Sequence, residues 1–346
     1  MHKFLTRNSL SIGSLLLFLS AFVVFFAMPN VQADNEATTP LQVEPQTNDV
    51  KFQQAGSNFF DFKLAATDKM EQTVAVKVTN PSQKQVKVKT SLNKATTSPT
   101  AEVIYNQNGE KSAVKSLFKT NDLFTLANPA DGEFELNPGE SKDIQVKIKT
   151  PETATYTSFS GEILAGINFN EPDEKNDDVS VPLAIKKGKG TDPNIRMGKI
   201  ETASKYDTNI INALVSNTHP SLLKNTDFKA DIVKKGTNDV VASFTRTNGE
   251  IAPNSKFNFG IPWNTKRVIP GVYTIKLKIN SSDPQFGSKG RTWFFEKDFI
   301  VTVFDAVKAN LAVTHSIPWL FMLIVIVLLA VFSSLIYGFI KIRKAK

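Results

Sequence analysis

Apolar and polar residues alternate with a period of two through most of the chain between its two ends. Successive side chains of a strand point to opposite faces, so this pattern predicts antiparallel strands with one buried and one solvated face. Pro-Gly and Asn-Gly pairs separate the alternating segments and mark turns at 108–109, 138–139, 248–249 and 270–271. Short strands with frequent turns predict an all-β sandwich fold. The clearest segments are 73–78, 86–89, 144–148 and 273–279.

A weak internal repeat divides the alternating region into two halves. A strand ends at Asn80 in the first half and at Asn217 in the second, and each is soon followed by Pro-Ser. Pro138 and Pro253 then precede similar strand openings, and 161–164 resembles 271–274. We interpret the repeat as two tandem immunoglobulin-like β-sandwiches. Coincidence is the alternative, because such turns are common in β proteins.

The two halves differ in length between these landmarks. The interval from Asn80 to Pro138 is 22 residues longer than that from Asn217 to Pro253, which places an insert within residues 95–127. Insertions in a sandwich usually emerge as loops, and loops carry binding. We expect the insert to form a binding surface of the first domain; an added hairpin or short helix without such a role is the alternative.

Two long apolar segments bracket the alternating region. The first follows Lys3 and Arg7 and ends before Val31-Gln32-Ala33, the pattern of a secretory signal peptide cleaved after residue 33; an uncleaved anchor is the alternative. The second, 317–340, is uncharged, is long enough to cross a bilayer and is followed by a basic tail. Basic tails stay in the cytoplasm, so we expect a single-pass cell-membrane protein whose domains face the cell wall.

The domain boundary is expected in an acidic loop at 170–180, with the flexible stretch 186–194 as a second candidate. The expected organisation is a signal peptide over 1–33, a first sandwich over 34–172, a second over 173–310, a transmembrane helix over 317–340 and a cytoplasmic tail over 341–346.

The net charge of +8 belongs mainly to the terminal segments. They hold six basic and no acidic residues, so the exported part has 35 basic against 33 acidic residues. This balance does not indicate a nucleic-acid partner. The chain has no cysteine, which excludes disulfides and thiolate sites and is typical of a Gram-positive surface protein.

Catalytic and metal-binding patterns are not found in the sequence. Its three histidines have no metal-ligand spacing, and Ser-x-x-Lys occurs without the Lys-Thr-Gly strand that penicillin-binding enzymes require. We therefore expect neither an enzyme nor a cofactor. Aromatic rings are the remaining candidates for contact with glycan or a partner, with core packing as the competing interpretation. We expect Phe59, Phe60 and the residues from Tyr156 to Phe159 to be exposed near loops, and core packing to be the favoured role of Trp263 and Trp293. The full set of candidates is Phe59, Phe60, Tyr105, Phe118, Tyr156, Phe159, Trp263 and Trp293.

The chain resembles the WxL-interacting protein family of Gram-positive cell surfaces over almost its whole length. The resemblance lies in SNFFDFKL, QTVAVKVTNPS, KVKTSLNKATT, AEVIY, LNPGESKDIQVKIKTP and SFSGEILAGINF of the first half. In the second half it lies in IAPNSKFNFGIPW, PGVYTIKLKI and TWFFEKDFIVT, together with the terminal apolar segment. The joining stretch 177–190 departs from regular alternation and leaves the start of the second domain open.

The resemblance implies a peptidoglycan-binding domain followed by a host-binding domain. It implies peptidoglycan, WxL-type surface proteins and host extracellular components as partners, in addition to the membrane. The chain has no Trp-x-Leu triplet and no Leu-Pro-x-Thr-Gly motif, so we expect a partner of WxL proteins that sortase does not release. A scaffold and adhesin is the leading hypothesis. An extracytoplasmic chaperone for surface-protein assembly is the alternative, since such chaperones present strand edges to exported subunits.

Overall fold

A computed structural model describes residues 40–114, 117–173, 178–205, 208–237, 239–263, 267–313 and 326–329. The expected signal peptide and cytoplasmic tail lie outside these residues, as does most of the expected transmembrane segment. Among the residues that are described, no helix combines the length and the apolar character needed to cross a membrane.

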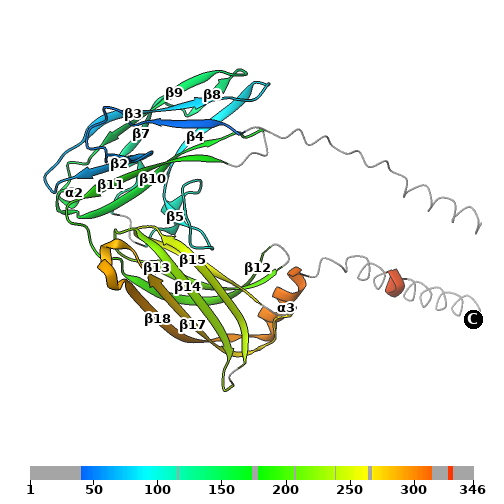
Figure 1. Ribbon diagram of the computed structural model, residues 1–346. Helices are drawn as coiled ribbons and strands as arrows, with labels where there is room; N and C mark the ends of the chain where they lie inside the picture. The colour runs from blue at the N-terminus through cyan, green and yellow to red at the C-terminus, as the bar shows by residue number, and fades with distance from the viewer. Residues whose placement is uncertain are drawn as a thin grey trace, which may run out of the picture. The chain divides into compact units, whose positions relative to one another are not determined.

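The first sandwich consists of two packed sheets (Figure 1). One sheet has the order β1-β3-β9-β7 and the other the order β2-β11-β10-β4-β8. All pairs are antiparallel except β2 with β11. The strands are β1 (Gln42–Gln46), β2 (Phe60–Leu64), β3 (Glu71–Thr79), β4 (Val86–Lys94), β7 (Phe124–Asn128), β8 (Glu133–Leu136), β9 (Ser141–Lys149), β10 (Gly161–Asn170) and β11 (Val179–Lys187); a short helix, α2 (Ala154–Ser158), joins β9 to β10.

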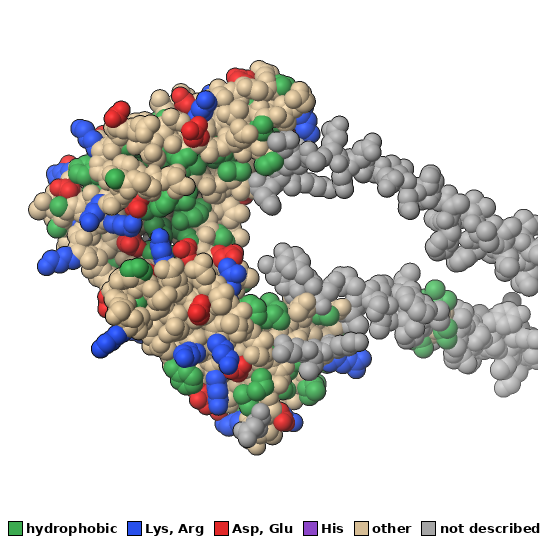
Figure 2. Space-filling model, in the orientation of Figure 1, with side chains coloured by type: hydrophobic (Ala, Val, Ile, Leu, Met, Phe, Trp, Pro, Cys, Tyr) green, Lys and Arg blue, Asp and Glu red, His purple; other side chains and the backbone are tan. Residues whose placement is uncertain are grey.

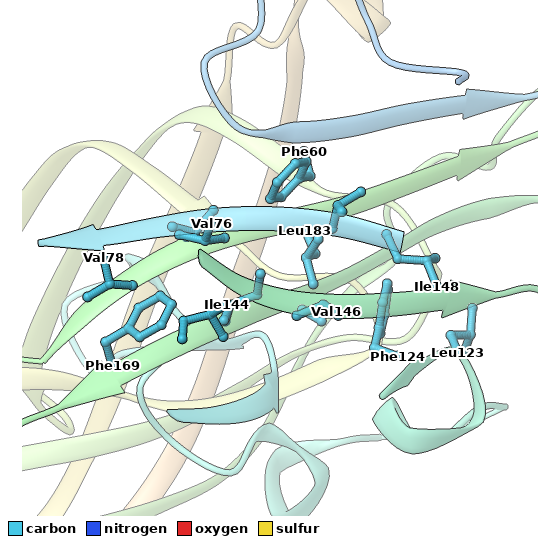
Figure 3. Packing of buried hydrophobic residues seen from close by; sticks show 14 of the residues in the cluster. Phe60, Val76, Val78, Leu123, Phe124, Ile144, Val146, Ile148, Phe169 and Leu183 are labelled. Carbon is cyan, nitrogen blue, oxygen red and sulfur yellow. The ribbon is translucent and has the colours of Figure 1, made fainter. Parts of the chain in front are cut away.

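Alternation along these strands builds the first core. Val76 and Val78 of β3 are fully buried, whereas Lys77 between them is exposed. Figure 3 shows Val76 and neighbouring residues of β9 packed near Phe169 and Leu183, which belong to the other sheet. The predicted antiparallel strands over 73–78, 86–89 and 144–148 are therefore confirmed.

The second sandwich packs the sheet β12-β13-β16 against the sheet β15-β14-β17-β18. Fully buried Phe228 and Phe259 stack at 5.1 Å in its core. The predicted strand over 273–279 is confirmed within β17. The elements are β12 (Ile195–Lys205), β13 (Thr208–Asn217), β14 (Leu223–Lys234), β15 (Val240–Ile251), β16 (Ser255–Pro262), β17 (Gly271–Ser281), the 3-10 helix η4 (Pro284–Lys289), β18 (Arg291–Val301) and α3 (Val303–Val313).

The strand pairings repeat between the two sandwiches. The β3–β9 and β4–β10 pairs of the first correspond to β13–β16 and β14–β17 of the second. Asn80 and Asn217, which close equivalent strands, are both buried and donate their side-chain N–H groups to nearby carbonyls. Each also accepts a backbone N–H two residues later, from Ser82 and His219 respectively. The repeat seen in the sequence is thus a structural repeat with a shared asparagine-centred turn.

The second sandwich does not start at residue 173; the connection between the sandwiches lies in the second of the two candidate stretches, 186–194. Strand β11 pairs with β10 and β2, and its Val181, Leu183 and Ile185 lie in the first core. The acidic loop at 170–180 therefore connects two strands of one sheet. The connection to the second sandwich runs instead between Lys187, which ends β11, and Ile195, which begins β12. Local charge and the lack of apolar residues mark a loop, but they do not say which strands the loop joins.

The insert between β4 and β8 contains several short elements. Strands β5 (Thr96–Thr97) and β6 (Val103–Ile104) pair with each other, and two 3-10 helices, η2 (Gly109–Ser112) and η3 (Thr120–Asp122), precede β7. The predicted turn at Asn108 begins η2, and that at 138–139 joins β8 to β9. The predicted turn at Asn248 is wrong, because β15 continues through it. Asn248 has a φ of 52° beside an irregular register, so the pair forms a bulge.

Candidate functional site

The first part of the insert, residues 96–102, is bound to the second sandwich. Ala101 is fully buried within the second hydrophobic core. Its carbonyl accepts the N–H of Glu250 at 2.8 Å, and the carbonyl of Pro99 accepts the N–H of Gly260 at 3.1 Å. The Thr97 hydroxyl accepts the N–H of buried Ala252 at 2.9 Å. This segment therefore completes the hydrogen bonding and packing of a domain to which it does not belong in sequence.

The remainder of the insert forms a groove against the first sandwich. We name it the junction groove, and it has a polar part and an apolar part that share Lys94, Lys119 and Thr120. The polar part is an open recess of about 320 Å³ whose further lining is Leu92, Asn93, Asn108, Glu110 and Asn121. The apolar part, a narrower cleft, includes Leu117, Phe118, Phe124, Phe159, Ile163 and Leu164, and reaches Pro253 and Asn254 of the second sandwich.

Local structure fixes the polar wall of the groove. Glu110 accepts the Thr120 N–H at 2.9 Å and its hydroxyl at 3.0 Å, so the carboxylate ties η2 to η3. The residue before Glu110 must be a glycine, because a Cβ on Gly109 would lie 2.1 Å from the Lys94 carbonyl oxygen. The groove is therefore a built feature of the insert.

The groove carries a mixture of charge and amide groups. Burial lowers the pKa of Lys94, and the nearby Glu110 carboxylate partly opposes that effect. Lys119 is exposed at the rim, beside the amide side chains of Asn93, Asn108 and Asn121. On the face seen in Figure 2, basic and acidic side chains are interspersed. Such a groove suits a ligand with amides, hydroxyls and an occasional carboxylate better than a polyanion.

Three of the predicted aromatic residues form one cluster at the groove. The Phe118 ring packs edge-on against Tyr156 at 5.5 Å and against Phe159 at 5.3 Å. Phe118 is half-buried, whereas Tyr156 and Phe159 are buried at 3% and 6% exposure. The expectation that Tyr156 and Phe159 are exposed is therefore wrong. Burial raises the pKa of Tyr156 to about 12.

A buried lysine holds this cluster in place. The Lys187 ammonium, only 2% exposed, donates to the carbonyls of Thr157 at 3.0 Å and Phe159 at 3.1 Å. It also lies 5.2 Å from the centre of the Tyr156 ring. These carbonyls close the short helix α2, so the cation satisfies groups that the helix end leaves unpaired.

The other first-domain candidates lie away from the groove surface. Phe60 is fully buried in the first core, so the expectation that it is exposed is wrong. Phe59 and Tyr105 pack in a small cluster between the insert and β10. Burial raises the pKa of Tyr105, with a smaller contribution from Glu250. A Cβ on Gly166 would lie 2.5 Å from the Tyr105 Cβ, so this glycine lets the tyrosine dock.

The two tryptophan candidates pack in the second sandwich, as the core-packing interpretation expected. Trp263 is 5% exposed and its indole N–H donates to the Arg267 carbonyl at 3.1 Å. Trp293 is partly buried against Phe286, and the Arg291 guanidinium lies 5.3 Å from its ring. Whether any of the eight aromatic residues contacts a ligand remains a prediction.

Sequence reasoning located the insert but missed the polar side chains that shape the groove. Lys94, Thr120 and the three asparagines lie on β4, in the insert loop and on η3, and only the folded chain brings them together. The available signal in the sequence was the extra length of the first half, which marked residues 95–127 as an insert. Within the described ranges, no group of three or more His, Asp or Glu side chains is placed to hold a metal ion.

A second open recess, of about 420 Å³, lies where the β10–β11 sheet meets the second sandwich. It is lined by Lys186, Lys189 and Lys224 together with acidic groups that include Asp192 and Asp283. At its edge, Glu162 accepts the Leu222 N–H at 2.7 Å. Burial raises the pKa of the Glu162 carboxyl, although this hydrogen bond and the lysines act in the opposite direction.

Comparison with known protein families identifies cell-surface binding domains in both halves of the chain. Residues 41–171 match the model described as WxL Interacting Protein, peptidoglycan binding domain. Residues 178–311 match WxL Interacting Protein, host binding domain. The chain belongs to the WxL Interacting Protein family. The second match begins just before β11, although that strand completes the first sandwich.

Solved structures resemble the chain only distantly, and a search of curated proteins finds no match. The CsuC–CsuE chaperone–adhesin complex of Acinetobacter baumannii matches at 13% identity and a TM-score of 0.29, over 64% of this chain and 90% of that one. The E. coli chaperone DraB matches at 14% identity and a TM-score of 0.25, over 76% of this chain and 98% of that one. A family 123 glycoside hydrolase from Clostridium perfringens matches at 14% identity and a TM-score of 0.27, over 44% of this chain and 28% of that one. Scores this low carry no argument about function.

Proposed function

We propose that the protein is a membrane-anchored, non-catalytic scaffold of the cell surface that binds peptidoglycan through its first domain. The second domain would bind WxL-type surface proteins and host components. The family match over both domains is the observation that carries this proposal. The repeated strand pairings further support assigning both sandwiches to the immunoglobulin-like class.

The junction groove is the part of the first domain that best suits peptidoglycan. Peptidoglycan combines N-acetylated sugars with short peptides that end in carboxylates. The Lys119 ammonium can pair with a carboxylate, and the neighbouring asparagine amides can bind acetamido and peptide groups. The Phe118 ring forms part of the adjoining apolar cleft and offers a surface for a sugar ring or an acetyl methyl group.

Membrane anchoring is proposed from the sequence alone. The uncharged segment 317–340 has the length of a bilayer span, and the basic residues of 341–346 favour a cytoplasmic C-terminus. The anchor would hold both domains at the base of the wall, where they could meet peptidoglycan and exported partners.

A co-sedimentation assay on insoluble peptidoglycan tests the wall-binding part of the proposal. Lys119→Met removes the rim ammonium, and Lys77→Met removes an exposed ammonium from the outer face of β3, on the opposite sheet. We expect the full-length protein and Lys77→Met to bind alike and Lys119→Met to bind about tenfold more weakly, which corresponds to about 1.4 kcal/mol. Equal binding of both variants would refute the groove assignment. Absence of binding by the unmodified protein would refute the peptidoglycan proposal itself.

A further inference from the structure

Helix α3 follows the last strand of the second sandwich and is defined by its own sequence. The Thr302 hydroxyl accepts the Asp305 N–H at 3.1 Å, and the Asp305 carboxylate accepts the Thr302 N–H at 3.1 Å. This reciprocal capping starts the helix at Val303. The helix therefore has a fixed beginning, and its described part runs to Val313.

One side of α3 is fastened to the second sandwich. Ala306 and Ala309 are buried in its core, against β12 and β13. The Asn310 side chain accepts the Val268 N–H at 2.8 Å and donates to the Val268 carbonyl at 2.9 Å. The Ser204 hydroxyl donates to the Ala309 carbonyl at 3.2 Å. These contacts determine which side of the helix faces away from the protein.

The adjoining side of α3 is apolar and exposed. Val303, Phe304, Val307 and Leu311 are 68%, 74%, 50% and 70% exposed. At about 100° per residue they occupy one stripe of roughly 100°. Together they present on the order of 400 Å² of apolar surface, since a fully exposed side chain of this size offers about 150 Å² or more. Ile269, 62% exposed, follows Val268, whose carbonyl accepts the Asn310 side chain of α3.

The position of this stripe in the chain indicates what covers it. Only residues 314–316 separate the end of α3 from the uncharged segment that begins at residue 317. Even a fully extended chain of this length spans only about 14 Å. If 317–340 crosses the bilayer, Val313 must lie within that distance of the outer membrane surface, and the rest of α3, about 16 Å long, extends from there. Lys308, exposed at the edge of the stripe, can reach lipid phosphates while the apolar side chains lie deeper.

We propose that α3 is an interfacial helix, whose stripe of Val303, Phe304, Val307 and Leu311 lies in the outer leaflet at the boundary between headgroups and acyl chains. This inference rests on the proposed membrane anchor. The fastened side of α3 then makes the second sandwich rest on the membrane in one orientation. The anchor alone would tether the domain without determining its orientation.

The chain has no cysteine, so single labels can be placed without altering other thiols. The test uses full-length protein with Phe304→Cys, labelled with an environment-sensitive fluorophore and reconstituted into phosphatidylcholine–phosphatidylglycerol vesicles. Phe294→Cys is the matched control, because Phe294 is 61% exposed and lies about 23 Å back along β18 from Val301. Leu311→Cys provides a second site on the stripe. Circular dichroism checks that each labelled protein is folded.

We expect lipids that carry a quencher on the upper acyl chain to reduce emission from positions 304 and 311 at least threefold more than from position 294. Flotation with the vesicles combined with equal quenching at all three positions would overturn the interfacial helix while leaving the anchor intact. Failure to float would overturn both. A spectral shift at position 304 that grows with protein concentration in detergent would instead assign the stripe to a second copy of the chain.

Discussion

Thr97 offers a direct test of whether the insert completes the second sandwich. Thr97→Val preserves the shape of the side chain but removes the hydroxyl that accepts the Ala252 N–H. Ala252 is fully buried, so its N–H would lose its partner without gaining water. Leaving a buried donor unpaired costs about 1–3 kcal/mol. The substitution lies in the first family domain, yet we expect it to destabilise the second.

Intrinsic fluorescence can separate the two domains, because the first sandwich contains no tryptophan while Trp263 and Trp293 pack in the second. The experiment uses full-length protein carrying Trp319→Phe, so that only these two indoles report. For a domain of this size, 1 kcal/mol corresponds to roughly 4 °C in Tm. We therefore expect Thr97→Val to lower the fluorescence-detected Tm by roughly 4–12 °C.

The neighbouring Thr96 is a matched control. Its exposure is 4%, against 5% for Thr97, but its hydroxyl has no hydrogen-bond partner in the described part of the chain. Removing a buried hydroxyl that is already unpaired should be neutral or slightly stabilising. The reasoning is refuted if Thr97→Val leaves the fluorescence-detected Tm unchanged, or if Thr96→Val lowers it equally.

Three further substitutions test the docking of Tyr105, the closure of α2 and the charge of Glu162. Gly166→Ala should displace Tyr105 and lower the Tm by several degrees in calorimetry, with exposed Gly139→Asn as a tolerant control. Lys187→Met should cost about 2–4 kcal/mol in urea unfolding followed by circular dichroism, because two carbonyls lose a charged donor; an unchanged midpoint would contradict this role. The Glu162 pKa is raised on folding, so its contribution to stability is greatest at low pH and is lost as pH rises through the folded value. Glu162→Gln keeps an oxygen that can accept the Leu222 N–H but removes the titrating carboxyl. We therefore expect the Tm of the variant to equal that of wild type near pH 4 and to exceed it at pH 7. A variant Tm below that of wild type at pH 7 would contradict the predicted direction.

The sequence predicted the strands well because one face of each strand is buried. Val74, Val76 and Val78 alternate with polar residues, and any register that buried the wrong face would expose them. The repeat was equally legible, because Asn80 and Asn217 close equivalent strands with side-chain hydrogen bonds that few other residues could make.

The domain boundary and the role of the insert were harder to predict, because both depend on contacts between distant residues. Nothing local to Val179–Lys187 says that it pairs with Phe60–Leu64, more than a hundred residues earlier. Ala101 likewise shows no signal of its place in the second core, since a small residue suits a loop as well as a tight packing site. The exposure of Phe60 was misjudged for a related reason: adjacent residues of a strand point to opposite faces, so Phe60 enters the first core while Phe59 packs in the small cluster with Tyr105.

The docking of residues 96–102 has a consequence for biogenesis. This segment precedes every strand of the second sandwich in the chain, so we expect it to cross the membrane first during export and to be available when β14, β15 and β16 fold. We expect the second sandwich to assemble around residues 96–102, because these residues supply part of its core and of its hydrogen bonds. A chimaera that joins the first domain of one family member to the second domain of another near residue 178 would combine an insert and a second sandwich from different proteins. We expect their contacts to fit poorly. We therefore expect residues 96–102 to be inherited together with strands β14, β15 and β16. A fragment of the protein that is expressed alone or grafted onto another protein should contain both.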